Sequence, residues 1–199
     1  MIAVLQRYIE QFLVLTPEEL NALGKDIEVR SYDKKVRIID IGDKEEYLHF
    51  IVKGLARKFF YKGREEVITQ LAREGELISS SVSYFSGQPS GYVVETIEPC
   101  TFYSLRKETI ENLYTQYPRL EKLSRLVITE LFLQKEYWEL ERIRYNTKER
   151  FVRFMNSNPD LFQRVPQKYL ASYLNIKPET FSRLKHLLRK RSSDMPYLK

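Results

Sequence analysis

The last quarter of the chain combines small, apolar and charged residues at a spacing suited to nucleic-acid recognition. In "VPQKYLASYLNIKPETFSRLKHLLRKR", two apolar patterns of helical spacing flank a turn at Asn175. Asn is one of the few non-glycine residues that tolerate a left-handed backbone. Ala171 before the turn allows two backbones to approach, and Phe181 after it supplies a buried contact. The pattern predicts a helix-turn-helix with helices over 166–174 and 178–190.

The side chains left on the outer face of the second helix have the chemistry to read bases. Arg183 can donate two hydrogen bonds to guanine O6 and N7, and Glu179 can accept one from cytosine N4. Glu179 would also stabilise the positive end of the helix dipole. Since the N-terminal part of a recognition helix meets base edges, we expect the base-reading face to comprise Lys177, Pro178, Glu179, Ser182, Arg183 and His186, with Lys185 as the alternative to His186.

Positive charge is concentrated in the same region. Residues 146–199 hold 12 Lys/Arg against 4 Asp/Glu, a net of +8, whereas residues 1–145 hold 21 against 23, a net of −2. Contacts to phosphates position a protein on DNA without reading sequence. The candidates for such contacts are Gln167, Lys168, Arg189, Lys190 and Arg191. The charge favours a nucleic-acid-binding module, with a merely solvated basic surface as the alternative.

The chain from about residue 27 to 105 has a sequence pattern typical of β-strands. Short β-branched and aromatic runs alternate there with glycine-bearing turns: "EVRSY", "VRIIDI", "YLHFIV", "LARKFFY", "EEVITQL", "YVVETI" and "CTFYSL". Many short strands with turns at this spacing predict an antiparallel sandwich or barrel. Before it, "MIAVLQRYIEQF" predicts an amphipathic helix, and Thr16, Pro17 and Glu19 predict the capped start of another.

A long helix follows the strands. "PRLEKLSRLVITELFLQKEYWELERIRYN" starts at Pro118 and is apolar on more than one side. One small sheet cannot cover such a helix, so we expect it to pair with its twin in a homodimer. The alternative is a helix lying across the barrel of its own chain. Further helices are expected over about 106–115 and 147–157, with Pro166 at the first position (N1) of the helix-turn-helix.

These elements predict an α+β fold in three segments. Residues 1–116 form an antiparallel β-barrel sensor of jelly-roll type, 117–146 a dimerisation helix, and 147–199 the helix-turn-helix domain. The chain stops soon after the second helix of that motif. Any β-strand wing of the DNA-binding domain would therefore lie before Gln167. The stretch there, "NPDLFQRV", is short for the strands of a wing.

Two stretches carry a family resemblance. "RVPQKYLASYLNIKPETFSRLK" and "EGELISSSVSYFSGQPSGYVVETIEPC" resemble the superfamily of the cyclic-AMP receptor protein and the fumarate-nitrate reduction regulator, in particular its short members common in Bacteroidetes-type genomes. The resemblance implies a homodimer that places two recognition helices on a near-palindromic operator, with RNA polymerase as a further partner. It also implies that Glu179 and Arg183 read bases. Pro178 stands where the family usually has an arginine, so a different half-site is expected.

The sensor segment departs from the family pattern. Aligned on Gly75, the resemblance puts Ser80 at the position of the ribose-binding glutamate, Ser90 at that of the phosphate-binding arginine, and Gly91 at that of its serine partner. A serine cannot reproduce the bidentate, charge-assisted grip of a guanidinium on phosphate. We therefore expect a small-molecule effector other than cyclic AMP, or hydroxyl-rich turns of a vestigial sensor. The candidate pocket residues are Gly75, Glu76, Ser79, Ser80, Ser81, Ser90 and Gly91.

Other chemistry is poorly supported. Cys100 is the single cysteine, whereas an iron–sulfur cluster needs several thiolates; we expect a small buried strand residue. His49 has no ligand partner nearby in sequence, so a barrel histidine is expected rather than a haem ligand. There is no phosphate-binding glycine loop, nucleophile elbow or closely spaced His/Asp/Glu set. The sequence thus predicts no cofactor, no metal and no enzyme activity.

No apolar run approaches the roughly 20 residues that cross a bilayer, so no membrane partner and a cytoplasmic location are expected. The predicted function is that of a homodimeric, sequence-specific DNA-binding transcription regulator with an effector-sensing barrel. The alternative is a small-ligand-binding or interaction module whose basic tail binds nucleic acid non-specifically.

Overall fold

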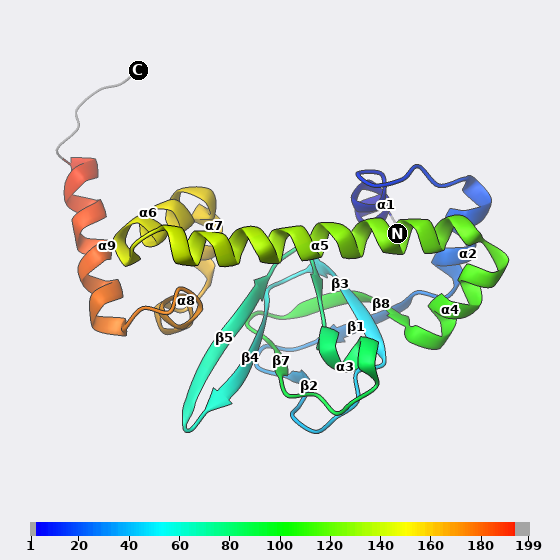
Figure 1. Ribbon diagram of the computed structural model, residues 1–199, viewed down its shortest axis with the longest axis horizontal. Coiled ribbons are helices and arrows are strands. Elements are labelled where there is room, and N and C mark those ends of the chain that lie inside the picture. Colours follow the sequence, from blue (N-terminus) through cyan, green and yellow to red (C-terminus); the bar gives the residue numbers. More distant parts are fainter. Residues whose placement is uncertain (1–2, 194–199) are drawn as a thin grey trace, which may run out of the picture. The chain divides into compact units, whose positions relative to one another are not determined.

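The computed structural model describes residues 3–193, with side chains through His186. The chain forms two compact units, Met1–Leu133 and Gln134–Lys199. The division between them falls inside the longest described helix, α5 (Pro118–Arg144), which runs horizontally in Figure 1. The sequence instead assigned the long helix a segment of its own, over 117–146.

The first unit is built on two four-stranded sheets, in which neighbouring strands pair antiparallel. Their strand orders are β1-β8-β3-β6 and β2-β7-β4-β5, and Figure 1 shows them as one barrel. The strands are β1 (Glu28–Tyr32), β2 (Arg37–Ile39), β3 (Tyr47–Lys53), β4 (Ala56–Lys62), β5 (Glu65–Ala72), β6 (Leu77–Ile78), β7 (Val93–Thr96) and β8 (Cys100–Arg106). The non-sequential strand order is that of a jelly-roll-like barrel, which confirms the predicted fold class.

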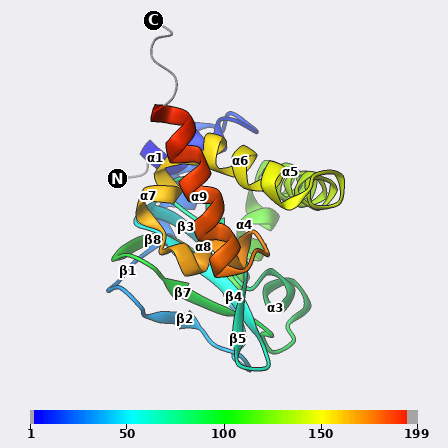
Figure 2. The same ribbon diagram turned by 90° about the vertical axis from the view of Figure 1, so that its left-hand side faces the viewer.

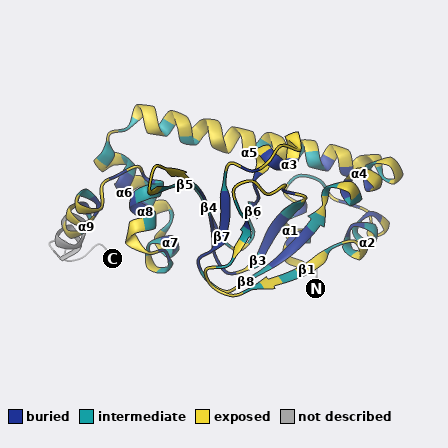
Figure 3. Cartoon of the chain, turned by 90° about the horizontal axis from the view of Figure 1, so that it is seen from below, coloured by how far each residue is buried: buried dark blue, intermediate teal, exposed yellow. Residues whose placement is uncertain are grey.

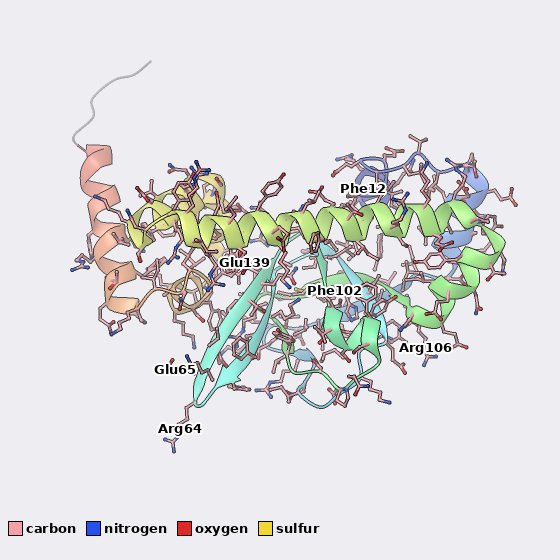
Figure 4. The ribbon with its side chains drawn as sticks, viewed as in Figure 1. Phe12, Arg64, Glu65, Phe102, Arg106 and Glu139 are labelled. Carbon is pink, nitrogen blue, oxygen red and sulfur yellow. The ribbon has the colours of Figure 1, made fainter. Side chains whose placement is uncertain are left out.

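A core of apolar side chains fills the space between the sheets. Ile51 and Phe102 are fully buried there, together with Ile78 and Val94. Phe102 lies inside the barrel in Figure 4, whereas Arg64 and Glu65 lie at the projecting tip of the β4–β5 hairpin. Alternating apolar residues make these strands visible in the sequence. The two-residue strand β6 was not predicted, because two residues carry no period.

A short helix, α3 (Ser81–Ser86), follows β6 and was also missed. Its sequence "SVSYFS" is poor in helix formers, since serine side chains compete for backbone hydrogen bonds. The helix forms because Ser83 and Tyr84 are buried against the barrel, at 1% and 4% exposure. Gly87 ends it in the left-handed conformation, with its N–H bonded to the Ser83 carbonyl.

A second apolar cluster joins the N-terminal helices to the barrel and to the start of α5. It includes Leu5 and Ile9 of α1 (Ala3–Ile9), Leu23 of α2 (Pro17–Lys25), Leu113 of α4 (Lys107–Gln116), and Leu120 and Leu123 of α5. The predicted capping box opens α2: Glu19 N–H donates to Thr16 Oγ1, and Thr16 N–H donates to the Glu19 carboxylate. Arg119 reaches the same carboxylate at 2.9 Å, which ties α2 to α5.

Beyond its first turns, α5 exposes apolar side chains. Figure 3 colours much of the helix as exposed. The exposed large apolar residues on α5 are Ile128, Leu131, Phe132, Leu133, Tyr137, Leu140 and Ile143. Since monomeric proteins rarely expose so many clustered apolar groups, this helix has the composition of an interface.

The second unit is helical throughout its described residues. It contains the end of α5, then α6 (Thr147–Ser157), α7 (Pro159–Arg164), α8 (Gln167–Tyr173) and α9 (Pro178–Ser193). Helix α7 occupies the "NPDLFQRV" stretch and was not predicted, because six residues are too few for a helical period. Pro166 was expected at N1 of α8 but is its N-cap, so the helix starts one residue later.

Within the described part of the chain, no helix combines the length and the apolar character needed to cross a bilayer.

Gly54, in the β3–β4 turn, has φ +99°, and a Cβ at this position would clash with the Pro99 carbonyl oxygen and lie 2.7 Å from Cys100 Sγ. We predict that Gly54→Ala lowers the free energy of unfolding by about 3 kcal/mol or more, since strain and overpacking add. The control is Gly42→Ala, with φ +93° and an open Cβ position, which should lose only about 1–2 kcal/mol. Urea denaturation measures both, and equal losses would contradict the packing argument.

Candidate functional site

The turn between α8 and α9 has a defined hydrogen-bond pattern. Asn175 adopts φ 53°, the left-handed conformation expected for it. Its N–H donates to the Ser172 carbonyl at 3.0 Å, and the Ile176 N–H donates to the Ala171 carbonyl at 2.9 Å. These two bonds form a Schellman motif, which ends α8 and turns the chain toward α9.

Apolar contacts fix the angle between the two helices. Leu170 and Ala171 of α8 are 0% and 1% exposed, and Phe181 of α9 is 1% exposed. Phe181 meets the ring of Phe151 from α6 edge-on, with ring centroids 5.1 Å apart. Figures 1 and 2 both show the N-terminal end of α9 beside α8. The small Ala171 and the large Phe181 thus have the roles that the sequence predicted.

One face of α9 remains open to solvent. Glu179, Ser182, Arg183 and His186 are all exposed. At about 100° per residue, these four positions fall within an arc of roughly 100° on the helix. Among the described residues Arg183 has no ion-pair partner, so its guanidinium is available to a ligand.

The other predicted contacts flank this face. Lys177 and Pro178 are exposed at the start of α9, where the Lys177 carbonyl accepts the Phe181 N–H at 2.9 Å. Gln167 and Lys168 are exposed at the start of α8. The side chains of Arg189, Lys190 and Arg191 lie outside the described residues, so their predicted phosphate contacts stay predictions.

The two serines at the predicted ligand positions are buried and meet each other. Ser80 is 0% exposed and Ser90 3%. Ser90 Oγ lies 2.7 Å from Ser80 Oγ and 2.8 Å from the Tyr92 carbonyl oxygen, and it accepts the Tyr92 N–H at 3.0 Å. Their hydroxyls therefore bond to each other and to the local backbone, and both side chains are shielded from solvent.

The remaining predicted pocket residues are dispersed. Gly75 and Glu76 form the β5–β6 turn, where the Glu76 carboxylate accepts the Arg73 N–H at 3.0 Å. Ser79 is buried, and its carbonyl accepts a hydrogen bond from Lys58. Ser81 and Gly91 are exposed. The structure brings Ser80 and Ser90 together and leaves Glu76 in a turn of its own.

Sequence reasoning missed Glu45, whose carboxylate is bonded to the backbone of Ser80. Glu45 lies in the run "DKEEY", a pattern typical of a solvated surface. It is 4% exposed, and its carboxylate accepts the Ser80 N–H at 3.3 Å. Nothing in the local sequence distinguishes Glu45 from Glu46, which is exposed and pairs with Arg106 at 2.9 Å.

Cys100 and His49 occupy the packed positions that the sequence predicted. Cys100 is 2% exposed, and burial raises the pKa of its thiol to about 11. A neutral thiol is a poor nucleophile and a poor redox sensor. His49 is 1% exposed, with Nδ1 2.7 Å from Ser104 Oγ. Among the described residues, no group of three or more His, Cys, Asp or Glu side chains is placed to hold a metal ion.

Comparison with known proteins identifies the barrel. Residues 29–117 match the family model described as the cyclic nucleotide-binding domain. This range runs from β1 through α4 and so includes the hydrogen-bonded pair Ser80 and Ser90. Among curated proteins no sequence matches.

Solved structures extend the similarity to both units. The catabolite activator protein of Thermus thermophilus is 21% identical, with a TM-score of 0.56 over 91% of this chain and 87% of that one. The c-di-GMP responsive global regulator CLP of Xanthomonas campestris is 13% identical, with a TM-score of 0.70 over 92% and 96%. FixK2 of Bradyrhizobium japonicum is 18% identical, with a TM-score of 0.68 over 83% and 86%. At these identities the likeness is one of fold.

The serine pair predicts a measurable stability difference. Ser90→Ala removes the partner of the Ser80 hydroxyl and of the Tyr92 N–H, so the free energy of unfolding should fall by about 1–3 kcal/mol. Ser81→Ala, at an exposed position of the same segment, should change it by less than about 0.5 kcal/mol. Thermal and urea unfolding measure both, and a neutral Ser90→Ala would contradict the hydrogen-bonded pair.

Proposed function

Because residues 29–117 match the family model of the cyclic nucleotide-binding domain and 91% of the chain aligns in fold with the catabolite activator protein, we propose that this protein is a homodimeric, sequence-specific DNA-binding transcription regulator. The observation that carries the proposal is the open face of α9, whose base-reading side chains project from a helix held by the Schellman turn. The proposed location is the cytoplasm, where the DNA lies.

Glu179 and Arg183 are the proposed base-reading pair. They lie four residues apart on α9, so their side chains are neighbours on one face. In a major groove, Arg183 donates to guanine O6 and N7, and Glu179 accepts from the cytosine amino group. A carboxylate facing DNA repels phosphates, so its place on this face is best explained by a base contact. Pro178 has no donor, which restricts direct readout at its position.

The basic character of residues 146–199 supplies the non-specific part of the affinity. Their net charge of +8 contrasts with −2 for the rest of the chain. Each phosphate contact releases counterions, so binding should weaken steeply with salt. This charge also favours the second candidate, an interaction module whose basic unit binds nucleic acid without reading sequence. The two candidates differ in what loss of Arg183 does.

The proposed dimer pairs two copies of α5. Leu126, Leu133, Tyr137 and Leu140 recur at spacings of seven, four and three residues, which places them on one stripe of the helix. Leu133, Tyr137 and Leu140 are 41%, 65% and 53% exposed in the single chain. Covering this stripe with its twin removes apolar surface from water and gives a two-fold dimer suited to a near-palindromic operator.

The barrel is proposed to bias the pose of the DNA-binding units through α5. A bound effector would then shift the population of DNA-competent dimers. The serine pair at positions 80 and 90 replaces the carboxylate and guanidinium that the family resemblance assigns to a cyclic nucleotide. We therefore propose that cyclic AMP is not the effector. Contact with RNA polymerase remains a proposal drawn from the resemblance alone.

Arg183→Ala tests base reading. On an operator selected by the wild-type protein from a random-sequence pool, we expect a loss of about 1–3 kcal/mol, and much less on random DNA. The control is Lys168→Ala, which should weaken both equally and reduce the salt dependence by about one phosphate contact. Fluorescence anisotropy measures both. Equal losses on both DNAs for Arg183→Ala would contradict base reading and favour the non-specific candidate.

The dimer predicts a second outcome. Leu133→Glu combined with Leu140→Glu would bury two carboxylates in the apolar stripe, so the dimer should dissociate at micromolar concentrations, with a loss of 100-fold or more in affinity. Lys135→Glu is the control, because residue 135 lies on the opposite side of α5. Sedimentation equilibrium measures both. A double variant that dimerises like the wild type would contradict this interface.

A further inference from the structure

Glu45 is an unusual residue for its position. It lies between β2 and β3, with its side chain 0% exposed. Burying a carboxylate is costly unless hydrogen bonds or an opposite charge compensate it. Its burial therefore requires either a structural role or a ligand, and both of its oxygens are bonded to the chain itself.

Three groups surround the Glu45 carboxylate. Oε1 accepts the Tyr47 N–H at 3.1 Å and lies 3.7 Å from His49 Nε2, and Oε2 accepts the Ser80 N–H at 3.3 Å. Two backbone N–H donors and an imidazole are the kind of environment that binds a free anion. Here the anion is a side chain of the protein.

The surrounding hydrogen bonds extend this contact to two further segments. The Glu45 N–H donates to Ser83 Oγ at 3.0 Å, and that hydroxyl donates to the Gln88 carbonyl at 2.6 Å. The Ser90 N–H donates to the Asp43 carbonyl at 2.7 Å. With the bond between Ser80 and Ser90, these bonds hold residues 79–83 and 88–92 against the β2–β3 connection. The carboxylate contributes the bond to the Ser80 N–H, and the Glu45 and Asp43 backbone contributes the others.

We propose that Glu45 is a built-in anion that locks residues 79–92 in one conformation, so that the barrel keeps its shape without a small anionic ligand. The family resemblance assigns the Ser80 position to a ribose-binding glutamate. In this barrel, whose residues 29–117 match the cyclic nucleotide-binding domain, a carboxylate beside that position comes from Glu45 of another segment and accepts the Ser80 N–H. The regulatory meaning rests on the proposed function, because it treats the barrel as the sensor of the DNA-binding unit. The lock itself is a property of the barrel.

The lock is tested by removing the Glu45 carboxylate through mutation and adding acetate to the solution in its place. Glu45→Ala deletes Cγ and the carboxylate, a group of the size and charge of acetate. We expect the variant to be destabilised and to regain stability with sodium acetate, relative to sodium chloride of equal ionic strength. If acetate binds with a Kd of about 10 mM, 100 mM should lower the unfolding constant about tenfold.

Three matched samples make the rescue specific. Wild-type protein should show no acetate-specific gain, and none with cyclic AMP. Glu45→Gln fills the same space and should not be rescued. Glu46→Ala removes the neighbouring exposed carboxylate, whose side chain is 54% exposed, and should respond as wild type does. A wild-type gain with acetate or cyclic AMP, or a Glu45→Ala variant as stable as wild type, would overturn the proposal.

Glu45→Gln serves if Glu45→Ala does not fold. Its amide keeps the volume but presents an NH₂ group to N–H donors, so hydrogen exchange of residues 79–92 should accelerate about tenfold or more while β4 and β5 are unchanged. Unchanged exchange in residues 79–92 would overturn the lock. All these measurements are made without DNA, so a failed lock is distinguishable from a failed Arg183→Ala test, which concerns the proposed function.

Discussion

The structure of the first unit depends on one requirement: every buried polar group needs a hydrogen-bond or ion-pair partner. The barrel buries charges as well as apolar side chains: Arg57 is 2% exposed and bonds to Glu95 at 2.8 Å and to Glu66 at 2.6 Å. Glu45 and His49 are also buried, and their side chains lie 3.7 Å apart. Because an unpaired buried charge is strongly destabilising, each of these contacts fixes the relative positions of the strands and loops that supply its two sides.

The same rule explains how the polar groups of the serine-rich segment are satisfied. Its hydroxyls bond to one another and to local backbone groups, and its backbone N–H at Ser80 meets a carboxylate. In the second unit, apolar contact has the corresponding role. The contact between Phe151 and Phe181 packs α6 against α9, and the Schellman turn at Asn175 sets the direction of α9. The polar side chains on the open face of α9 are therefore positioned by buried residues elsewhere in the unit.

Periodic signals account for what the sequence predicted correctly. Seven of the eight strands, the capping box at Thr16, the long helix and the turn at Asn175 each depend on neighbours within a few residues. The elements that were missed, β6, α3 and α7, are two to six residues long, and α3 is composed mainly of residues that disfavour helices. Such elements form because the rest of the fold buries them, which a local pattern cannot express.

The sequence by itself determined the α+β fold class, the basic C-terminal unit and the exposed chemistry of α9, because these follow from composition, period and turn residues. Only the tertiary structure decided which groups surround Ser80 and Ser90. Ser80 and Ser90 are ten residues apart, and Glu45 is 35 residues from Ser80. Their meeting is set by strand pairing and burial, and no spacing in the chain distinguishes the buried Glu45 from its exposed neighbour Glu46.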